Sequence, residues 1–168
     1  KTGLIYGPNS IGKSNLGKAI FDIVQNLTDK ERTPALYSSY ANAKHLELAI
    51  EFVYEFVFGS SRVRYEYTKL TYEDIIKEVF FIDGVEVVSR YGDTFHTALE
   101  GSETLNSNKL NSKISVMRFI KANAVLADNP TNNVVWSFFS FIDRMLMFSN
   151  LRQNYYQGFI VGNPLVDV

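Results

Sequence analysis

The sequence predicts an α/β fold in which a strand–loop–helix unit precedes an antiparallel β-meander and a C-terminal helical part. Three observations lead to this prediction. Residues 7–14 fit the pattern G-x-x-x-x-G-K-[ST] between a short apolar run and a helical pattern. Residues 46–91 alternate apolar and polar side chains, as strands with one buried face do. After residue 112, apolar side chains recur at helical spacing.

The motif at residues 7–14 has the residue types of a phosphate-binding loop (P-loop). Its two glycines allow the main chain to approach a phosphate closely, so that N–H groups of residues 10–14 turn toward the anion. Lys13 can place its ammonium group against the β- and γ-phosphates, and the hydroxyl of Ser14 can bind Mg²⁺. The following helix directs its positive dipole end at the same point. The predicted nucleotide-binding residues are Gly7, Pro8, Asn9, Ser10, Ile11, Gly12, Lys13, Ser14 and Asn15, with Ser14 as the Mg²⁺ ligand.

The flanking residues agree with this interpretation. Leu4, Ile5 and Tyr6 predict a buried strand that ends at the loop. A single apolar stripe then predicts one helix over residues 15–27, and the stripe consists of Leu16, Ala19, Ile20, Ile23, Val24 and Leu27. The opposite face of this helix is expected to face solvent, and it carries Asn15, Lys18, Asp22 and Gln25.

Residues 46–91 predict the antiparallel meander. Strands are expected at residues 46–58, 62–70 and 75–82, with another strand starting at Val85. The Asp83-Gly84 pair between two apolar runs is a strong signal for a two-residue hairpin turn.

The remaining chain predicts a polar, mobile connection at residues 94–111 and then two helices. Ser112 is the expected N-cap of the first helix, which should end at Asn129-Pro130, and Thr131 is the expected N-cap of the second. The second helix is apolar on most of its circumference, so we expect it to be covered on more than one side. Residues 1–111 would then hold the P-loop strand, the first helix and an antiparallel β-subdomain, and residues 112–168 an incomplete helical region.

The segment Gly7-Pro8-Asn9-Ser10-Ile11-Gly12-Lys13-Ser14-Asn15-Leu16 resembles the P-loop of ABC and SMC-like ATPases. It is most similar to bacterial AAA-family ATP-binding proteins of the abortive-infection and OLD-nuclease type. The resemblance covers residues 3–26, with a looser agreement in strand order up to residue 91. Ser10 stands where many relatives carry glycine, which leaves the roles of the lysine and the serine unchanged.

This resemblance implies a P-loop NTPase fold, the cofactors ATP and Mg²⁺, and a chain that is the N-terminal part of an ATPase. In that family, hydrolysis takes place between two domains, with the signature of one closing over the loop of the other. The sequence has no Leu-Ser-Gly-Gly-like signature, no apolar run ending in Asp-Glu and no switch histidine after it. We therefore expect hydrolysis to require the remainder of a longer parent protein and self-association. The resemblance further implies a nuclease, another effector or DNA as partners, in phage defence or DNA maintenance.

Composition narrows the remaining possibilities. A length of 168 residues is enough for one core, and a net charge of −1 gives no basic field for nucleic acid. The absence of cysteine excludes disulfides and suits the reducing cytoplasm, where we expect the protein. The apolar block at residues 134–148 is too short for a bilayer of about 30 Å and contains charged residues, so it predicts a buried helix and no membrane association. His45 and His96 stand far apart, so we expect no metal other than nucleotide-bound Mg²⁺.

Two other functions fit parts of the sequence. A non-catalytic protein-interaction module with a vestigial P-loop would bind through the tyrosine-rich strands and the aromatic helix. A GTPase or kinase would share the bare motif, but residues 108–111 end in Asn where a guanine-reading tetrad requires Asp. Asp83 follows a buried strand, as a Mg²⁺-binding Asp would, yet a hairpin explains it. Tyr37 or Tyr40 could stack on adenine, although loop aromatics more often pack on a sheet.

Overall fold

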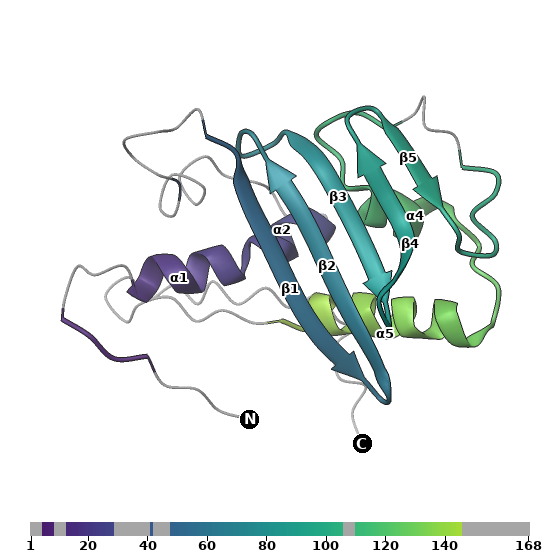
Figure 1. Cartoon of the computed structure of the whole chain (residues 1–168), viewed down its shortest axis with the longest axis horizontal. Helices are drawn as coiled ribbons and strands as arrows, with labels where there is room; N and C mark the ends of the chain where they lie inside the picture. The colour runs from purple at the N-terminus through teal and green to yellow at the C-terminus, as the bar shows by residue number, and fades with distance from the viewer. Residues whose placement is uncertain (1–4, 9–12, 29–40, 42–47, 106–109, 146–168) are drawn as a thin grey trace, which may run out of the picture.

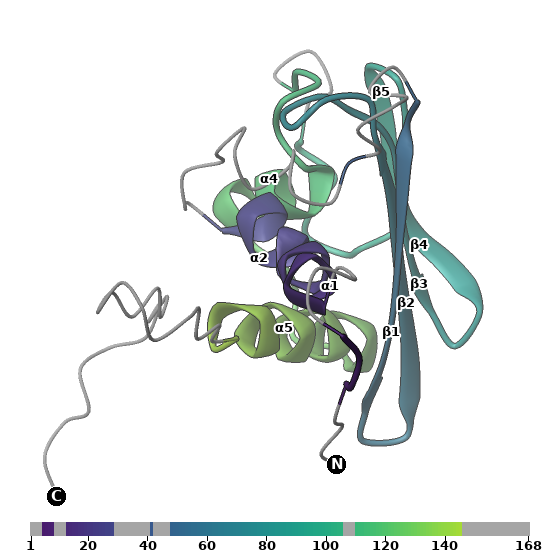
Figure 2. The ribbon, with the colours of Figure 1, turned by 90° about the vertical axis from the view of Figure 1, so that its left-hand side faces the viewer.

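The computed structural model describes residues 5–8, 13–28, 41, 48–105 and 110–145. These residues form two layers, a five-stranded sheet and a layer of helices (Figure 1). The helices are α1 (Lys13–Ile20), α2 (Asp22–Leu27), α4 (Val116–Asn123) and α5 (Pro130–Asp143). Figure 2 views the sheet along its edge and shows that all four helices cover the same face. The predicted mixed α/β class is confirmed.

The sheet is an antiparallel meander in which each strand pairs with the next along the chain. Its strands are β1 (Ile50–Phe58), β2 (Ser61–Lys69), β3 (Ile75–Ile82), β4 (Val85–Tyr91) and β5 (Thr94–Thr97), in the order β1-β2-β3-β4-β5. The predicted meander is confirmed, and the alternating pattern set its register because every second side chain had to reach the helices. The first strand begins at Ile50, four residues later than expected.

The core lies between the sheet and the helices. On the face covered by helices, the aromatic side chains of Phe52, Tyr65, Tyr67 and Phe80 are buried. Phe138 of α5 packs with its ring centroid 4.9 Å from that of Phe80. Removal of such large aromatic side chains from water is the main favourable term for this layer.

The hairpin predicted at Asp83-Gly84 is confirmed. Both residues have positive φ, 51° and 82°, as a tight turn between twisted strands requires. The carboxylate of Asp83 accepts a hydrogen bond of 2.7 Å from the backbone N–H of Arg62. Asp83 therefore has a structural role at the end of the sheet.

The prediction of a mobile connection at residues 94–111 is wrong for the part of this range that the structure describes. Thr94–Thr97 forms β5 and pairs with β4, and Leu99 and Ser102 are buried. The ring of Phe95 packs edge-on against Phe119 of α4 at a centroid distance of 6.0 Å. The segment is polar in sequence but is ordered by this tertiary contact. Residues 106–109 lie outside the described residues.

The two C-terminal helices exist, but their predicted boundaries are wrong. The hydroxyl of Ser115 caps α4 by accepting from the N–H of Arg118, whereas Ser112 donates to Asp74 on the segment before β3. α4 ends at Asn123, before the predicted stop at Asn129-Pro130. Asn129 caps α5 in place of Thr131, because Pro130 at the first helical position allows Asn129 to adopt the extended cap conformation.

The helix predicted over residues 15–27 is broken at Phe21 into α1 and α2. Phe21 has φ −82° and ψ −5°, and its carbonyl accepts from Val24 three residues on. The predicted polar face is wrong in α2, where all six residues are buried, including Asp22 and Gln25, whereas Asn15 of α1 is exposed. No residue of α1 is buried, and the apolar side chain of Leu16 is 47% exposed.

The strand predicted before the loop is not formed by the described residues. Ile5 and Tyr6 have no regular secondary structure, and they are 60% and 82% exposed. A strand needs a neighbour to pair its main-chain groups, and every strand pair in the described ranges is antiparallel and lies within residues 50–97. The parallel sheet that usually carries a P-loop is therefore absent from the described part of the chain.

The tight approach of Gly101 to the segment before α5 gives a stability prediction. Gly101 has φ +90°, and an added Cβ would lie 2.1 Å from the carbonyl oxygen of Val125. We expect Gly101→Ala to cost about 3 kcal/mol or more of unfolding free energy. Gly59→Ala, at φ +62° in open space, is the matched control and should cost only about 1–2 kcal/mol. Equal losses in denaturant unfolding would contradict the described packing of this loop.

Candidate functional site

The P-loop residues that the structure describes lie at the start of α1. Lys13 is the first residue of this helix, and Ser14 and Asn15 are exposed in its first turn. Gly7 and Pro8 lie in the segment before the loop, while Asn9, Ser10, Ile11 and Gly12 lie outside the described residues. The structure therefore shows the two ends of the motif.

Lys13 brings these two ends together. Its ammonium group donates hydrogen bonds to the carbonyl oxygens of Gly7, at 2.7 Å, and Pro8, at 2.6 Å. A lysine ammonium has three N–H donors, so one N–H remains beyond these two contacts. The positive charge is thus held between the first residues of the motif and the N-terminus of α1. An anion placed there would meet a fixed cation and the helix dipole together.

A buried ion pair attaches the next helix to the sheet. The carboxylate of Asp22, the first residue of α2, lies 2.6 Å from the ammonium of Lys69 on β2, and both side chains are 1% exposed. The hydroxyl of Tyr67 donates to the same oxygen of Asp22 at 2.6 Å. The Lys69 ammonium also lies over the rings of Phe52 and Tyr67, 5.9 and 5.5 Å from their centroids. These contacts compensate the loss of water around both charges.

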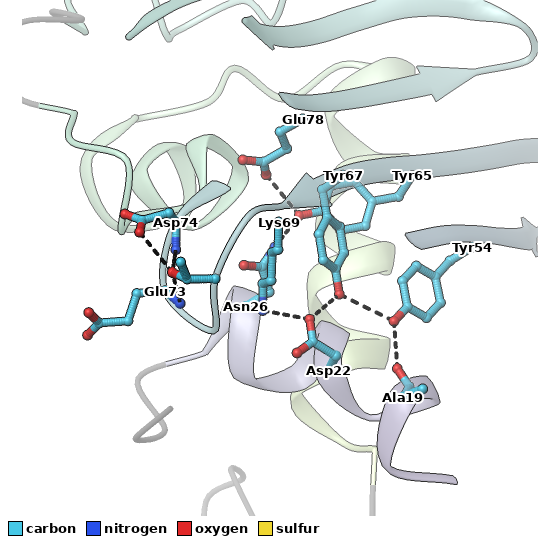
Figure 3. A network of polar contacts seen from close by, with 11 residues as sticks. Ala19, Asp22, Asn26, Tyr54, Tyr65, Tyr67, Lys69, Glu73, Asp74 and Glu78 are labelled. Atoms are coloured by element: carbon cyan, nitrogen blue, oxygen red, sulfur yellow. Dashed lines mark hydrogen bonds and ion pairs between the residues drawn. The ribbon is translucent and has the colours of Figure 1, made fainter. Parts of the chain in front are cut away.

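A second buried carboxylate, that of Glu78 on β3, holds α4. It accepts hydrogen bonds from the hydroxyls of Tyr65 and Ser115, at 2.8 and 2.6 Å. It also accepts from the first two backbone N–H groups of α4, at 2.7 and 3.2 Å. Tyr65, which lies beside Glu78 in Figure 3, in turn accepts from the amide of Asn26 on α2 at 2.8 Å. The network therefore joins α2 to α4. A negative charge at a helix N-terminus is electrostatically favourable.

Burial controls the ionisation of the tyrosines in this network. Removal from water raises the pKa of Tyr65 and of Tyr67 well above the ordinary value, and the nearby carboxylates of Glu78 and Asp22 raise them further. Both tyrosines are thus neutral hydrogen-bond donors at any physiological pH. Burial lowers the pKa of the Arg90 guanidinium, whose charge lies near Glu78.

Sequence reasoning missed this network. Asp22 was placed on the solvent side of its helix, although it is buried against the sheet. One signal was available: the inner face of the predicted strands carries Tyr54, Tyr65 and Tyr67, and buried tyrosine hydroxyls need polar partners. Asp22 and Asn26, one helical turn apart, supply such partners.

The other candidate residues that the structure describes do not form a common site with the P-loop residues. His96 is exposed on β5, and within the described ranges no group of His, Asp and Glu could hold a metal ion. The side-chain oxygen of Asn111 accepts from the N–H of Lys113 in a turn. His45, Tyr37, Tyr40 and the start of the tetrad at residues 108–111 lie outside the described residues. None of the helices in the described part of the chain is both long and apolar enough to cross a membrane.

A hollow of about 680 Å³ lies over the β1–β2 hairpin and the β3–β4 turn and includes Arg62, Arg64 and Phe81 in its lining. The guanidinium of Arg64 is paired here, since it lies 2.5 Å from Glu66 and 3.6 Å from Glu55. Mixed charges of this kind are typical of a solvated sheet face, and none of the described P-loop residues lines the hollow.

Comparison with known proteins identifies no family: no family model, no curated protein and no solved structure matches this chain.

The buried ion pair gives a prediction about stability. Lys69→Met removes the cation beside the Asp22 carboxylate, and we expect a loss of about 3–5 kcal/mol because a buried charge loses its partner. The double variant Asp22→Asn/Lys69→Met should recover part of this loss. Lys77→Met is the matched control, since this ammonium lies on the exposed face 3.7 Å from Glu66, and it should change stability by less than about 0.5 kcal/mol. Urea unfolding measures all three, and a Lys69→Met loss no larger than that of the control would disprove the role of the pair.

Proposed function

We propose that the chain binds ATP·Mg²⁺ through the loop at residues 7–15, as the N-terminal part of an ABC/SMC-like ATPase. The observation that carries the proposal is the position of Lys13. Within a G-x-x-x-x-G-K-S motif, its ammonium group lies 2.7 Å from the Gly7 carbonyl oxygen and 2.6 Å from that of Pro8, at the N-terminus of α1. This arrangement supports a site for a polyphosphate.

Each described loop residue has a chemical role in the proposal. Lys13 would use its remaining N–H on the β- and γ-phosphates. Ser14, exposed in the first turn of α1, would bind Mg²⁺ through its hydroxyl, and the N-terminal N–H groups of α1 would face the phosphate oxygens. The binding set proposed here is Gly7, Pro8, Asn9, Ser10, Ile11, Gly12, Lys13, Ser14 and Asn15.

In this proposal these residues bind the nucleotide, whereas ATP hydrolysis requires a larger assembly. The sequence lacks an Asp-Glu strand and a signature motif, which supply the metal ligand, the general base and the closing contact in the ATPases it resembles. The element order of loop, helix, antiparallel meander and helices supports that resemblance. The partners would be the remainder of the parent ATPase or a second copy, and a nuclease, another effector or DNA, in phage defence or DNA maintenance.

Titration calorimetry with ATP, ADP and GTP in the presence of Mg²⁺ tests nucleotide binding. We expect the wild-type protein to bind ATP, and Lys13→Ala to weaken the affinity by about 10-fold to 100-fold because a charge-assisted contact to phosphate is lost. Lys77→Ala removes an equal charge from β3 and should leave the affinity within about twofold.

Three results would contradict the proposal. No heat with any nucleotide would favour a protein-interaction module with a vestigial loop. A clear preference for GTP would favour a GTPase. Equal ATP affinity of wild type and Lys13→Ala would place the nucleotide at a site other than this loop.

The proposed metal contact is tested separately. For the wild-type protein we expect ATP to bind more tightly with Mg²⁺ than with EDTA, and we expect Ser14→Ala to lose about tenfold of affinity in Mg²⁺ and little in EDTA. Ser140→Ala, which removes an exposed hydroxyl from α5, is the matched control. A Ser14→Ala variant with an unchanged Mg²⁺ dependence would remove Ser14 from the metal site.

A further inference from the structure

The break between α1 and α2 coincides with a side chain from the sheet. In a continuous α-helix, the carbonyl of Ala19 would accept a hydrogen bond from the N–H of Ile23, four residues later. Instead, the hydroxyl of Tyr54 on β1 donates to the Ala19 carbonyl oxygen at 3.0 Å. Figure 3 shows the Tyr54 ring reaching from its strand to this last turn of α1.

The same hydroxyl also lies close to that of Tyr67. Burial raises the pKa of Tyr54, so this side chain remains a neutral hydrogen-bond donor. The two tyrosine oxygens lie 3.3 Å apart. The Tyr54 hydroxyl thus bonds to the Ala19 carbonyl, which Ile23 would bond to in a continuous helix. Insertion of a side chain into the helical hydrogen-bond ladder is a recognised cause of helix kinks.

The parts on the two sides of the break differ in how they are held. All of α2 is buried, and its first residue, Asp22, is fixed by Tyr67 and Lys69. α1 has no buried residue, and Lys13 at its far end holds the start of the P-loop motif. The direction in which α1 leaves the break therefore determines where Lys13 and Ser14 lie relative to the sheet.

We propose that Tyr54 is a positioning residue for the phosphate site: its hydroxyl keeps α1 and α2 as two helices and thereby sets the positions of Lys13 and Ser14 relative to the sheet. The inference rests on the proposed nucleotide binding. Tyr54 does not contact the ligand, and it acts through the main chain of α1. Nucleotide binding should in turn strengthen the contact between Tyr54 and Ala19.

The test is Tyr54→Phe, which removes the hydroxyl and keeps the ring that stacks between Phe52 and Phe56. We expect the Kd for ATP·Mg²⁺, measured by calorimetry, to rise by about threefold to tenfold, the usual worth of one hydrogen bond. The affinities for ADP and inorganic pyrophosphate should weaken by the same factor, because Lys13 and Ser14 move together with α1. Tyr91→Phe removes an exposed tyrosine hydroxyl from β4 and should leave all three affinities unchanged.

A second readout separates positioning from a merely structural role. A hydroxyl that only stabilises the fold would lower the Tm with and without ligand by the same amount. A positioning residue also reduces the increase in Tm that ATP·Mg²⁺ produces, in step with the change in Kd. Unchanged affinity together with an unchanged ligand-induced increase in Tm would overturn the inference while leaving the proposed function intact.

Hydrogen exchange of the wild-type protein tests the positioning role of Tyr54 without any substitution. We expect ATP·Mg²⁺ to slow exchange at the break by at least about threefold, at the N–H groups of Phe21 and Val24, which bond to Gly17 and Phe21. Exchange that does not change in a protein that binds ATP would contradict the positioning role alone. If the wild-type protein binds no nucleotide, the proposed function and this inference fail together.

Discussion

The ion pair between Asp22 and Lys69 is the contact on which the two-layer arrangement depends. Two charges that are 1% exposed are stable in a protein interior only when their remaining hydrogen-bonding capacity is also used. Here the Tyr67 hydroxyl donates to the carboxylate, and two aromatic faces lie beside the ammonium. Because the partners come from α2 and β2, this pair specifies how the helix lies on an otherwise aromatic sheet face.

A similar solution recurs at α4. Glu78 of β3 is fully buried and accepts from two hydroxyls and from the first N–H groups of the helix. Its cross-strand neighbour Arg90 is also buried and donates to the carbonyl oxygens of Gly92 and Ile114. The inner face of the sheet therefore holds two polar centres within an apolar core. Hydrophobic burial supplies most of the driving force, while the polar centres define which helix lies where.

The phosphate-loop motif is followed by a helix that is far less buried than the other helices. α1 lies outside the core and is continued by a helix that is buried along its entire length. In this arrangement the described motif residues Gly7, Pro8, Ser14 and Asn15 are exposed, while the helix that follows α1 is attached to the sheet. The Tyr54 hydroxyl lies at the junction of these two parts, between a segment of low burial and one of high burial.

The sequence alone determined the elements whose signals are local. Alternation along each strand, the Asp83-Gly84 turn and the apolar stripe of α5 are all set by neighbours within a few residues. The sequence does not predict β5, because four residues with a single apolar side chain, that of Phe95, become a strand only when β4 lies beside them. Ser115 rather than Ser112 caps α4 because Ser115 reaches Glu78, which is 37 residues away along the chain.

Only the tertiary structure decided that Asp22 is buried and that α1 and α2 are separate helices. Helical periodicity assigns a carboxylate to the solvent face when its partner is distant in the sequence. Lys69, the partner of Asp22, lies 47 residues away along the chain. Likewise, no local pattern reveals a tyrosine hydroxyl that interrupts a helix from a neighbouring strand. A charge or a hydrogen bond is satisfied in three dimensions, so periodicity along the chain predicts apolar faces better than it predicts buried polar contacts.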